Sequence, residues 1–279
     1  MKRSTPQGSA ESVLRTGVIR LAIGQCHPIP RDLAGSLQRA ERLLIEAAQG
    51  GADWLVLPEL FLGGYQLEDL GSLALEASSP QLEALRQVAK RTGVGFQVGF
   101  VEAHLGTYWN SVLVVSPEGD AQTYAKTHLY GREVGTFSGG HRFISVMSAA
   151  VGVGSLICYD IEFPEPARIL AGRGVSLVLV SSANMVPFAE DQVLFARARA
   201  RENQIFMAVA NRVGVESGYQ FCGTSVVSDP LGTILCRAGE RSEQTLLVDC
   251  DMTLVANSRT KHSYLQERRP DLYCELVDQ

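Results

Sequence analysis

Residues 154–168 read GSLICYDIEFPEPAR, a stretch that passes from an apolar run into a proline-rich turn. Residues 151–157 are apolar or small, which is typical of a strand buried on both faces. The Pro-Glu-Pro sequence at Pro164 indicates a helix to about Arg173, since proline fits the first helical turn. Cys158 therefore lies at an elbow between strand and helix, where backbone N–H groups are free to bind negative charge. The alternative is a cysteine that packs as a small apolar residue.

Strands and helices alternate on both sides of this elbow. Predicted strands cover residues 18–25, 53–57, 95–101, 111–115, 121–124, 151–157, 175–181, 205–211, 224–228, 233–237 and 245–249. Predicted helices cover residues 33–49, 79–93, 164–173 and 188–203. A glycine followed by an apolar strand recurs, as GADWLVL from Gly51 and as GVSLVLV from Gly174. We therefore expect one α/β domain in which two similar β-α-β halves face each other.

The composition is that of an ordinary globular protein. The chain has 279 residues, of which 46% are hydrophobic and 20% charged, and its formal net charge is -5. This balance provides no basic field to attract a phosphate backbone, so no nucleic acid is expected as a partner. No stretch approaches the roughly 20 apolar residues that span a bilayer, so no membrane contact is expected either.

The N-terminus and the cysteines indicate a cytoplasmic protein. Residues 1–16 contain basic residues without a following apolar run, which excludes a secretory signal and favours a flexible tail. Residues 17–279 would then form a single domain. The six cysteines include no C-x-x-C pair, and no histidine pair has zinc spacing, so we expect neither a disulfide framework nor a metal site.

Two further polar segments begin where predicted strands end. Glu59 follows strand 53–57 in an apolar setting, where burial would raise its pKa and suit a general base. The alternative is that Glu59 points to solvent or pairs with an arginine. Lys126 opens the polar segment 126–140 and would stabilise an oxyanion, although most lysines are simply solvated. Glu133 would either hold Lys126 in place or contribute only loop polarity.

A strand-end glutamate, a loop lysine and an elbow cysteine in this chain order resemble the carbon–nitrogen hydrolase superfamily, often called the nitrilase superfamily. The matching stretches are LPELFLGGY at 57–65, KTHLYGREVGTFSGG at 126–140 and GSLICYDIEFPEPAR at 154–168. The resemblance extends from about Val18 to Asp249. It implies a four-layer α-β-β-α sandwich, which agrees with the predicted order of strands and helices.

The resemblance also implies roles for the site residues. Cys158 matches the nucleophile, Glu59 the general base, Lys126 the group that stabilises the transition state and Glu133 a supporting glutamate. The implied reaction forms a thioester on the cysteine, with the oxyanion near Lys126 and the backbone N–H of Tyr159. No metal or organic cofactor is implied.

Residues after the cysteine favour a small amide as the substrate. Nitrile-cleaving relatives usually carry Trp-Glu there, whereas Tyr159-Asp160 is similar to the amidase and carbamoylase branches. Relatives that deamidate carboxylate-bearing substrates, such as ω-amidase, often have arginine at the place of Glu162. Because Glu162 would repel a carboxylate, we expect a neutral or amine-bearing carboxamide. The alternative is that Glu162 only caps the helix that starts at Pro164.

Three more residues are candidates for the substrate pocket. Tyr65 lies shortly after the strand-end glutamate, and Asn184 and Met185 follow the strand expected beside that of the cysteine. Ordinary loop packing is the alternative for each. The tail YLQERRPDLY at residues 264–273 resembles bacterial aliphatic and stereoselective amidases of the superfamily, which supports the amidase branch.

Other hypotheses use the same residues. An N-carbamoyl amine or amino-acid hydrolase would use the same three groups on a ureido substrate, and a nitrilase is a less favoured alternative. A catalytically idle scaffold would keep only the fold. The family commonly dimerises through helices around the elbow, and helix 188–203 combines apolar and arginine side chains. A homodimer or higher homo-oligomer is therefore the expected assembly.

Overall fold

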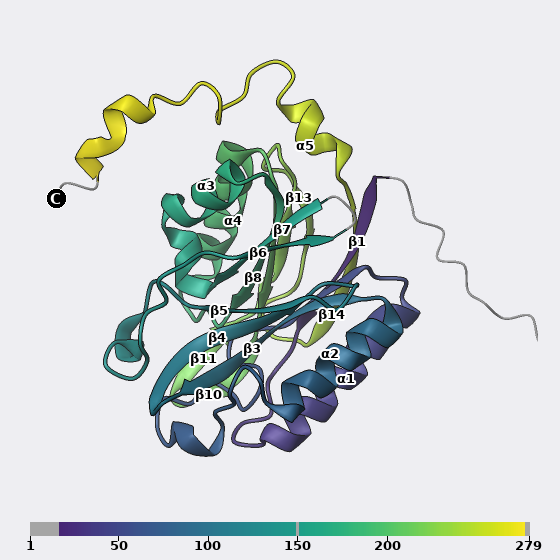
Figure 1. The fold of residues 1–279 in the computed structure, drawn as a ribbon, viewed down its shortest axis with the longest axis vertical. Helices are drawn as coiled ribbons and strands as arrows, with labels where there is room; N and C mark the ends of the chain where they lie inside the picture. Colours follow the sequence, from purple (N-terminus) through teal and green to yellow (C-terminus); the bar gives the residue numbers. More distant parts are fainter. Residues whose placement is uncertain (1–16, 149–150, 277–279) are drawn as a thin grey trace, which may run out of the picture.

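Two β-sheets lie face to face in the computed structural model, which describes residues 17–148 and 151–276 (Figure 1). The first sheet contains, in spatial order, β14 (Gln244–Asp251), β1 (Val18–Gln25), β2 (Trp54–Val56), β3 (Gly95–His104), β4 (Thr107–Val115) and β5 (Ala121–Ala125). The second contains β13 (Ile234–Arg237), β12 (Val226–Ser228), β9 (Phe206–Asn211), β8 (Val175–Ser182), β7 (Val151–Ile157) and β6 (Ser145–Ser148).

Helices cover the outer face of each sheet. The helices on the first sheet are α1 (Leu33–Gln49) and α2 (Pro80–Thr92), and those on the second are α3 (Pro164–Gly172) and α4 (Ala189–Asn203) (Figure 1). This arrangement confirms the predicted four-layer α-β-β-α sandwich. Across the described ranges, no helix combines the length and the apolar character needed to cross a membrane.

The two sheets have the same internal arrangement, which confirms the predicted pair of similar halves. In the first, α1 and α2 connect the parallel strands β1, β2 and β3; in the second, α3 and α4 connect the parallel strands β7, β8 and β9. Antiparallel strands extend each set of three on both sides. Because parallel strands end at the same edge of a sheet, the residues that follow them gather there.

The central strands are buried on both faces, which explains their short apolar runs. On β2, Trp54 and Val56 belong to the core between the sheets, whereas Leu55 packs outward with Leu44 of α1 and Leu85 of α2. A strand enclosed in this way has no polar face, so its sequence does not alternate.

The structure differs from the sequence prediction at several shorter elements. The hairpin of β3 and β4 continues to a pair between His104 and Thr107, beyond the predicted strands 95–101 and 111–115, because its polar end still makes ladder hydrogen bonds. The unpredicted strands and α-helices are β6, the hairpin of β10 (Val213–Glu216) and β11 (Tyr219–Cys222), and α5 (Thr253–Ser258). Two short 3-10 helices, η1 (Leu70–Ser72) and η4 (Pro270–Leu276), were not predicted either. The predicted tail 1–16 lies outside the described residues.

Direct contacts fix the ends of β2 and β8 against each other across the sandwich. The hydroxyl of Ser181 donates a hydrogen bond to the carbonyl oxygen of Leu57 at 2.7 Å. The amide of Glu59 donates to the carbonyl oxygen of Ser182 at 3.4 Å. The segment that carries Glu59 is therefore held by the second sheet as well as by the first.

Gly99 on β3 allows a close approach of the backbone around Glu59. The amide of Gly99 donates to Pro58 O at 3.2 Å, and the amide of Leu62 donates to Gly99 O at 2.9 Å. A Cβ atom at this position would lie 2.6 Å from Pro58 O and 2.8 Å from the carbonyl carbon of Glu59. Only a residue without a side chain fits here unless the glutamate segment moves.

We predict that Gly99→Ala destabilises the protein and displaces Glu59. Overpacking of this kind costs about 2 kcal/mol of unfolding free energy, and misplacement of the residue expected to act as general base lowers kcat/KM about 100-fold. Denaturant titration and amide hydrolysis kinetics measure the two effects. The control is Gly172→Ala, where an added Cβ meets nothing within 4 Å. Equal behaviour of the two variants would contradict the prediction.

Candidate active site

The three residues expected to carry the chemistry follow strands of both sheets and converge at one place. Glu59 follows β2, Lys126 follows β5 and Cys158 follows β7. Lys126 and Cys158 line the same pocket, and the Lys126 ammonium forms an ion pair with Glu59 at 2.7 Å. The alternative that Glu59 points to solvent or pairs with an arginine is wrong, because its side chain is fully buried against Lys126.

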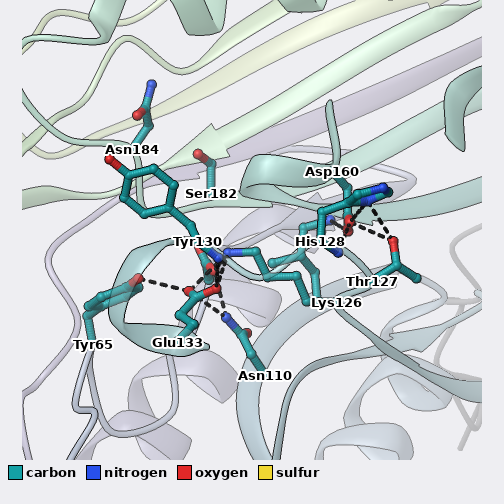
Figure 2. Close-up of polar contacts among 12 residues, drawn as sticks. Tyr65, Asn110, Lys126, Thr127, His128, Tyr130, Glu133, Asp160, Ser182 and Asn184 are labelled. Carbon is teal, nitrogen blue, oxygen red and sulfur yellow. Dashed lines mark hydrogen bonds and ion pairs between the residues drawn. The ribbon is translucent and has the colours of Figure 1, made fainter. Parts of the chain in front are cut away.

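A buried lysine between two carboxylates forms the inner part of the site (Figure 2). Lys126 Nζ donates to Glu59 Oε1 at 2.7 Å and to Glu133 Oε1 at 2.9 Å. Glu133 lies in the short 3-10 helix η2 (Gly131–Glu133), within the segment predicted as loop. Its contact with Lys126 supports the prediction that it holds the lysine, and argues against mere loop polarity.

Three further donors satisfy these carboxylates. Asn110 Nδ2 on β4 donates to Glu59 Oε1 at 2.6 Å. The same nitrogen reaches Glu133 Oε1 at 3.3 Å (Figure 2). The hydroxyl of Tyr65 donates to Glu133 Oε1 at 2.8 Å, and the amide of Tyr130 donates to Glu133 Oε2 at 2.9 Å. Glu133 is thus fixed on both oxygens. Glu59 Oε2, by contrast, is buried without a hydrogen-bond partner among the described residues.

Burial and charge set the protonation states of the site. Burial and then the negative charge of Glu59 raise the pKa of the Cys158 thiol, while Lys126 and contacts with Ser182 and the Ala183 backbone act in the opposite direction. Burial raises the pKa of Glu59, because it outweighs the attraction of Lys126. Burial alone would lower the pKa of Lys126, but the two carboxylates outweigh it and hold that pKa well above its usual range.

The predicted elbow is present at the end of β7. Cys158 begins the 3-10 helix η3 (Cys158–Glu162), and α3 follows from Pro164. The backbone of Cys158 is left-handed, with φ 42°, a conformation that costs an L-residue about 1 kcal/mol. The N-cap of α3 is Phe163 and makes no side-chain capping bond, so the structure gives no support to Glu162 as the cap of this helix.

Asp160 ties the elbow to the lysine segment (Figure 2). Its Oδ2 accepts hydrogen bonds from the Tyr124 hydroxyl at 2.7 Å and the Ile157 amide at 3.1 Å. Its Oδ1 accepts from the Thr127 hydroxyl at 2.7 Å and the His128 amide at 2.9 Å. One buried carboxylate therefore fixes the residues just before Cys158 and those on either side of Lys126.

A pocket of about 370 Å³ opens onto the cysteine. All five residues predicted to contact substrate line it: Tyr65, Tyr159, Glu162, Asn184 and Met185. The sequence prediction missed several others, namely Tyr130, Ala183, Phe188, Asp191 and Phe195. Phe188, Asp191 and Phe195 lie at or near the start of α4, a helix whose sequence alone indicates only packing.

The unpredicted hairpin of β10 and β11 supports one wall of this pocket. Phe221 forms a β-bridge with Met185, and the Cys222 amide donates to Asn184 O at 3.0 Å. Arg212 is buried beneath the hairpin, with its guanidinium 4.0 Å from the ring centroid of Phe221 and ion-paired to Glu216. Strands of only four residues have no strong sequence signal.

Nothing in the described part of the chain gathers three or more His, Cys, Asp or Glu side chains in a way that could hold a metal ion. The groups around Cys158 are instead those of nucleophilic chemistry: a thiol, a buried carboxylate with a free oxygen and a buried ammonium group. The same combination of groups can be sought in known proteins.

Residues 20–260 match the family model described as carbon-nitrogen hydrolase. The chain belongs to the carbon–nitrogen hydrolase family. It is similar to an (R)-stereoselective amidase from Pseudomonas sp, with 39% identity over 240 residues that cover 85% of this chain and 87% of the relative. The resemblance inferred from the sequence motifs is thereby confirmed, and the protein is a carbon–nitrogen hydrolase.

Solved structures of an amidase from Nesterenkonia sp. AN1 share the carbon–nitrogen hydrolase fold. A cysteine-to-alanine mutant in complex with butyramide has a TM-score of 0.80 and 29% identity, and covers 94% of this chain and 99% of that chain. A glutamate-to-glutamine mutant carries acrylamide added at the active site cysteine, with a TM-score of 0.79 and 29% identity over 92% of this chain and 99% of that chain.

We predict that Asp160→Asn lowers both stability and turnover. An amide nitrogen cannot accept the hydrogen bonds that one carboxylate oxygen now receives, and the buried donors left unpaired cost about 3 kcal/mol of unfolding free energy. Because Cys158 and Lys126 both lose their fixed positions, kcat should fall about 100-fold and KM much less. The exposed Asp120→Asn is the matched control; a kcat equal to that of the control would contradict this role.

Proposed function

We propose that this enzyme hydrolyses the C–N bond of a small neutral or amine-bearing carboxamide, giving a carboxylate and ammonia through a thioester on Cys158. The observation that carries the proposal is the meeting of Cys158 with the buried Lys126 and Glu59 at one pocket. A thiol, a base and a fixed positive charge in this arrangement suit an acyl-transfer reaction.

The raised pKa of the Cys158 thiol sets the first step. A thiol of this kind is protonated at neutral pH and needs a base as it attacks the amide carbon. Glu59 supplies that base, because its Oε2 is free to accept a proton while Oε1 is bound to Lys126 and Asn110. The new bond is S–C, and the thiol proton moves to Glu59.

The tetrahedral oxyanion forms near Lys126 Nζ and the backbone N–H of Tyr159. A positive charge held at a fixed position needs no reorganisation when the negative charge develops, and loss of one such donor costs about 3 kcal/mol of barrier. Glu59 then gives its proton to the leaving nitrogen, and the C–N bond breaks. Water deprotonated by the same glutamate attacks the thioester, releases the carboxylate and restores the thiol.

The pocket supports an amide without a carboxylate group as the substrate. Glu162 faces this pocket and repels anions. Tyr159-Asp160 after the cysteine resembles the amidase and carbamoylase branches. Mutants of the similar Nesterenkonia amidase hold butyramide in a complex and acrylamide added at the active site cysteine, and both amides are small and neutral. An N-carbamoyl substrate would release carbon dioxide together with ammonia, which distinguishes the two activities in one assay.

A homodimer remains the proposed assembly. Exposed apolar side chains on the helices around the elbow, Ile169 of α3 and Leu194 of α4, are 38% and 59% exposed. Such side chains suit the core of an interface between two copies. Light scattering on the purified protein measures the mass directly, and a monomer would reject this assembly.

We predict that Cys158→Ala abolishes ammonia release from small amides while the protein stays folded. Alanine keeps the β-carbon at the elbow but has no nucleophile. The control is Cys274→Ala, which removes an exposed thiol. Coupled ammonia assays and circular dichroism measure activity and fold. Turnover by Cys158→Ala at the rate of the control would exclude the thioester mechanism.

The pH dependence of kcat/KM provides a separate test. Because burial raises the pKa of Glu59, its carboxylate gains a proton as pH falls through that raised value and can no longer accept one from the thiol. We expect an acid limb above the ordinary glutamate pKa of about 4.3. Glu59→Gln should lower kcat about 1000-fold, whereas the exposed Glu118→Gln should keep both rate and limb. An acid limb at about 4.3 would argue against a buried base.

A further inference from the structure

The outer wall of the catalytic pocket carries two carboxylates that form no ion pair with any described residue. Glu162 and Asp191 both line the pocket that opens onto Cys158. Within residues 17–148 and 151–276, neither side chain has a hydrogen bond or an ion pair. The buried cation that lines the same pocket, Lys126, is already shared by two glutamates deeper in the site. A substrate that enters the pocket therefore passes two unpaired negative charges.

The charges are close enough to act on each other. Burial, and then the negative charge of Asp191, raise the pKa of Glu162, while the charge of Lys126 acts in the opposite direction without reversing the rise. The guanidinium of Arg199 does not relieve this repulsion, because it donates to the backbone oxygen of Glu162 at 2.7 Å and forms its ion pair with Glu202 at 3.0 Å. The side chain of Glu162 therefore lines the pocket without an ion-pair partner among the described residues.

Aromatic side chains line the same pocket as the two carboxylates. The other members of this wall include Tyr130, Tyr159, Phe188 and Phe195. The rings of Tyr130 and Tyr159 meet edge to face with centroids 5.2 Å apart. Aromatic faces attract cations, and their apolar surface fits the methylene groups of an alkyl chain. Carboxylates next to aromatic rings are the combination that binds an alkylammonium group.

We propose that Glu162, Asp191 and these aromatic side chains form a subsite for an ammonium group, so that the preferred substrates are carboxamides with a protonated amine on the acyl chain. This inference rests on the proposed amidase function and narrows its substrate class. A neutral alkyl chain would fill the aromatic part of the wall but leave both carboxylates unpaired. A carboxylate in the same position would be repelled by both.

Pairs of substrates with equal shape test the subsite. The pairs are butanamide with 3-aminopropanamide, pentanamide with 4-aminobutanamide, and hexanamide with 5-aminopentanamide, each differing by a methyl against an ammonium group. Ammonia release at about pH 7.5, where the amines are protonated, gives kcat/KM for each. We expect kcat/KM of the ammonium member to exceed that of its neutral partner about tenfold in at least one pair. This ratio should fall in about 0.5 M salt, because salt screens the charges.

Variants of the wall assign the effect to the two carboxylates. The double variant Glu162→Gln and Asp191→Asn should lower the ammonium-to-neutral ratio of kcat/KM about tenfold. Each single variant should give a ratio between those of the wild type and the double variant. Glu165→Gln, which removes an exposed charge outside the pocket, is the matched control and should keep the ratio. A wild-type ratio of one or less at all three chain lengths overturns the subsite, as does an unchanged ratio in the double variant.

The two proposals fail in different ways. Hydrolysis of the neutral amides by the wild type and its loss in Cys158→Ala establish the amidase chemistry whatever the ratio. If those amides are hydrolysed without any preference for the ammonium member, the subsite is wrong and the amidase function stands. If Cys158→Ala hydrolyses both members at the wild-type rate, the amidase mechanism itself is wrong.

Discussion

The buried ion cluster of Lys126 with Glu59 and Glu133 is the constraint on which the rest of the structure depends. All three side chains are at most 1% exposed, and removing them from water costs several kcal/mol per ion unless partners replace the lost hydration. The lysine and the neighbouring Asn110 and Tyr65 supply those partners. Since one lysine faces two carboxylates, the cluster keeps an excess negative charge close to the thiol.

The hydrogen bonds within the cluster differ between the two glutamates, and so do the roles that suit them. Glu133 is bound on both oxygens, which suits a group that must hold its neighbours still. Glu59 is bound on one oxygen only, and its pKa is raised, so it is the member of the pair that can exchange a proton. The two residues are chemically identical, and they differ because Glu59 Oε2 lacks a hydrogen-bond partner among the described residues. This free oxygen suits Glu59 for the proposed role of base.

The cluster can form only because the two sheets face each other. Its residues come from segments that follow β2 and β5 in the first sheet, and the proposed nucleophile Cys158 follows β7 in the second. Asp160 joins these parts with hydrogen bonds to Tyr124 and Ile157. The packing of the two sheets therefore determines the alignment of the reacting groups. A change where the sheets meet, such as a side chain on Gly99, affects both the packing and the alignment.

The sequence predicted the parts of the site that follow strong local patterns. Buried strands give continuous apolar runs, so the polar residues that interrupt their ends, Glu59 and Cys158, stand out, and the order of the motifs identified the family. Asn110 did not stand out, because it lies inside a strand and its partners are distant in the chain. Asp191 resembled any acidic residue in the first turn of a helix.

Residues such as Asp191 acquire a role only through tertiary contacts, and this explains why substrate preference is harder to predict than reaction type. The reaction needs a thiol, a base and a cation at fixed separations, which constrains the sequence at the strand ends. The outer wall only needs a net charge and a shape, which many side chains on loops and helix ends can provide. In this pocket the inner carboxylates are paired with Lys126, whereas the outer carboxylates Glu162 and Asp191 have no ion-pair partner among the described residues. A group that pairs with them must arrive with the substrate, so the wall selects by charge while the reaction centre leaves the acyl chain free to vary.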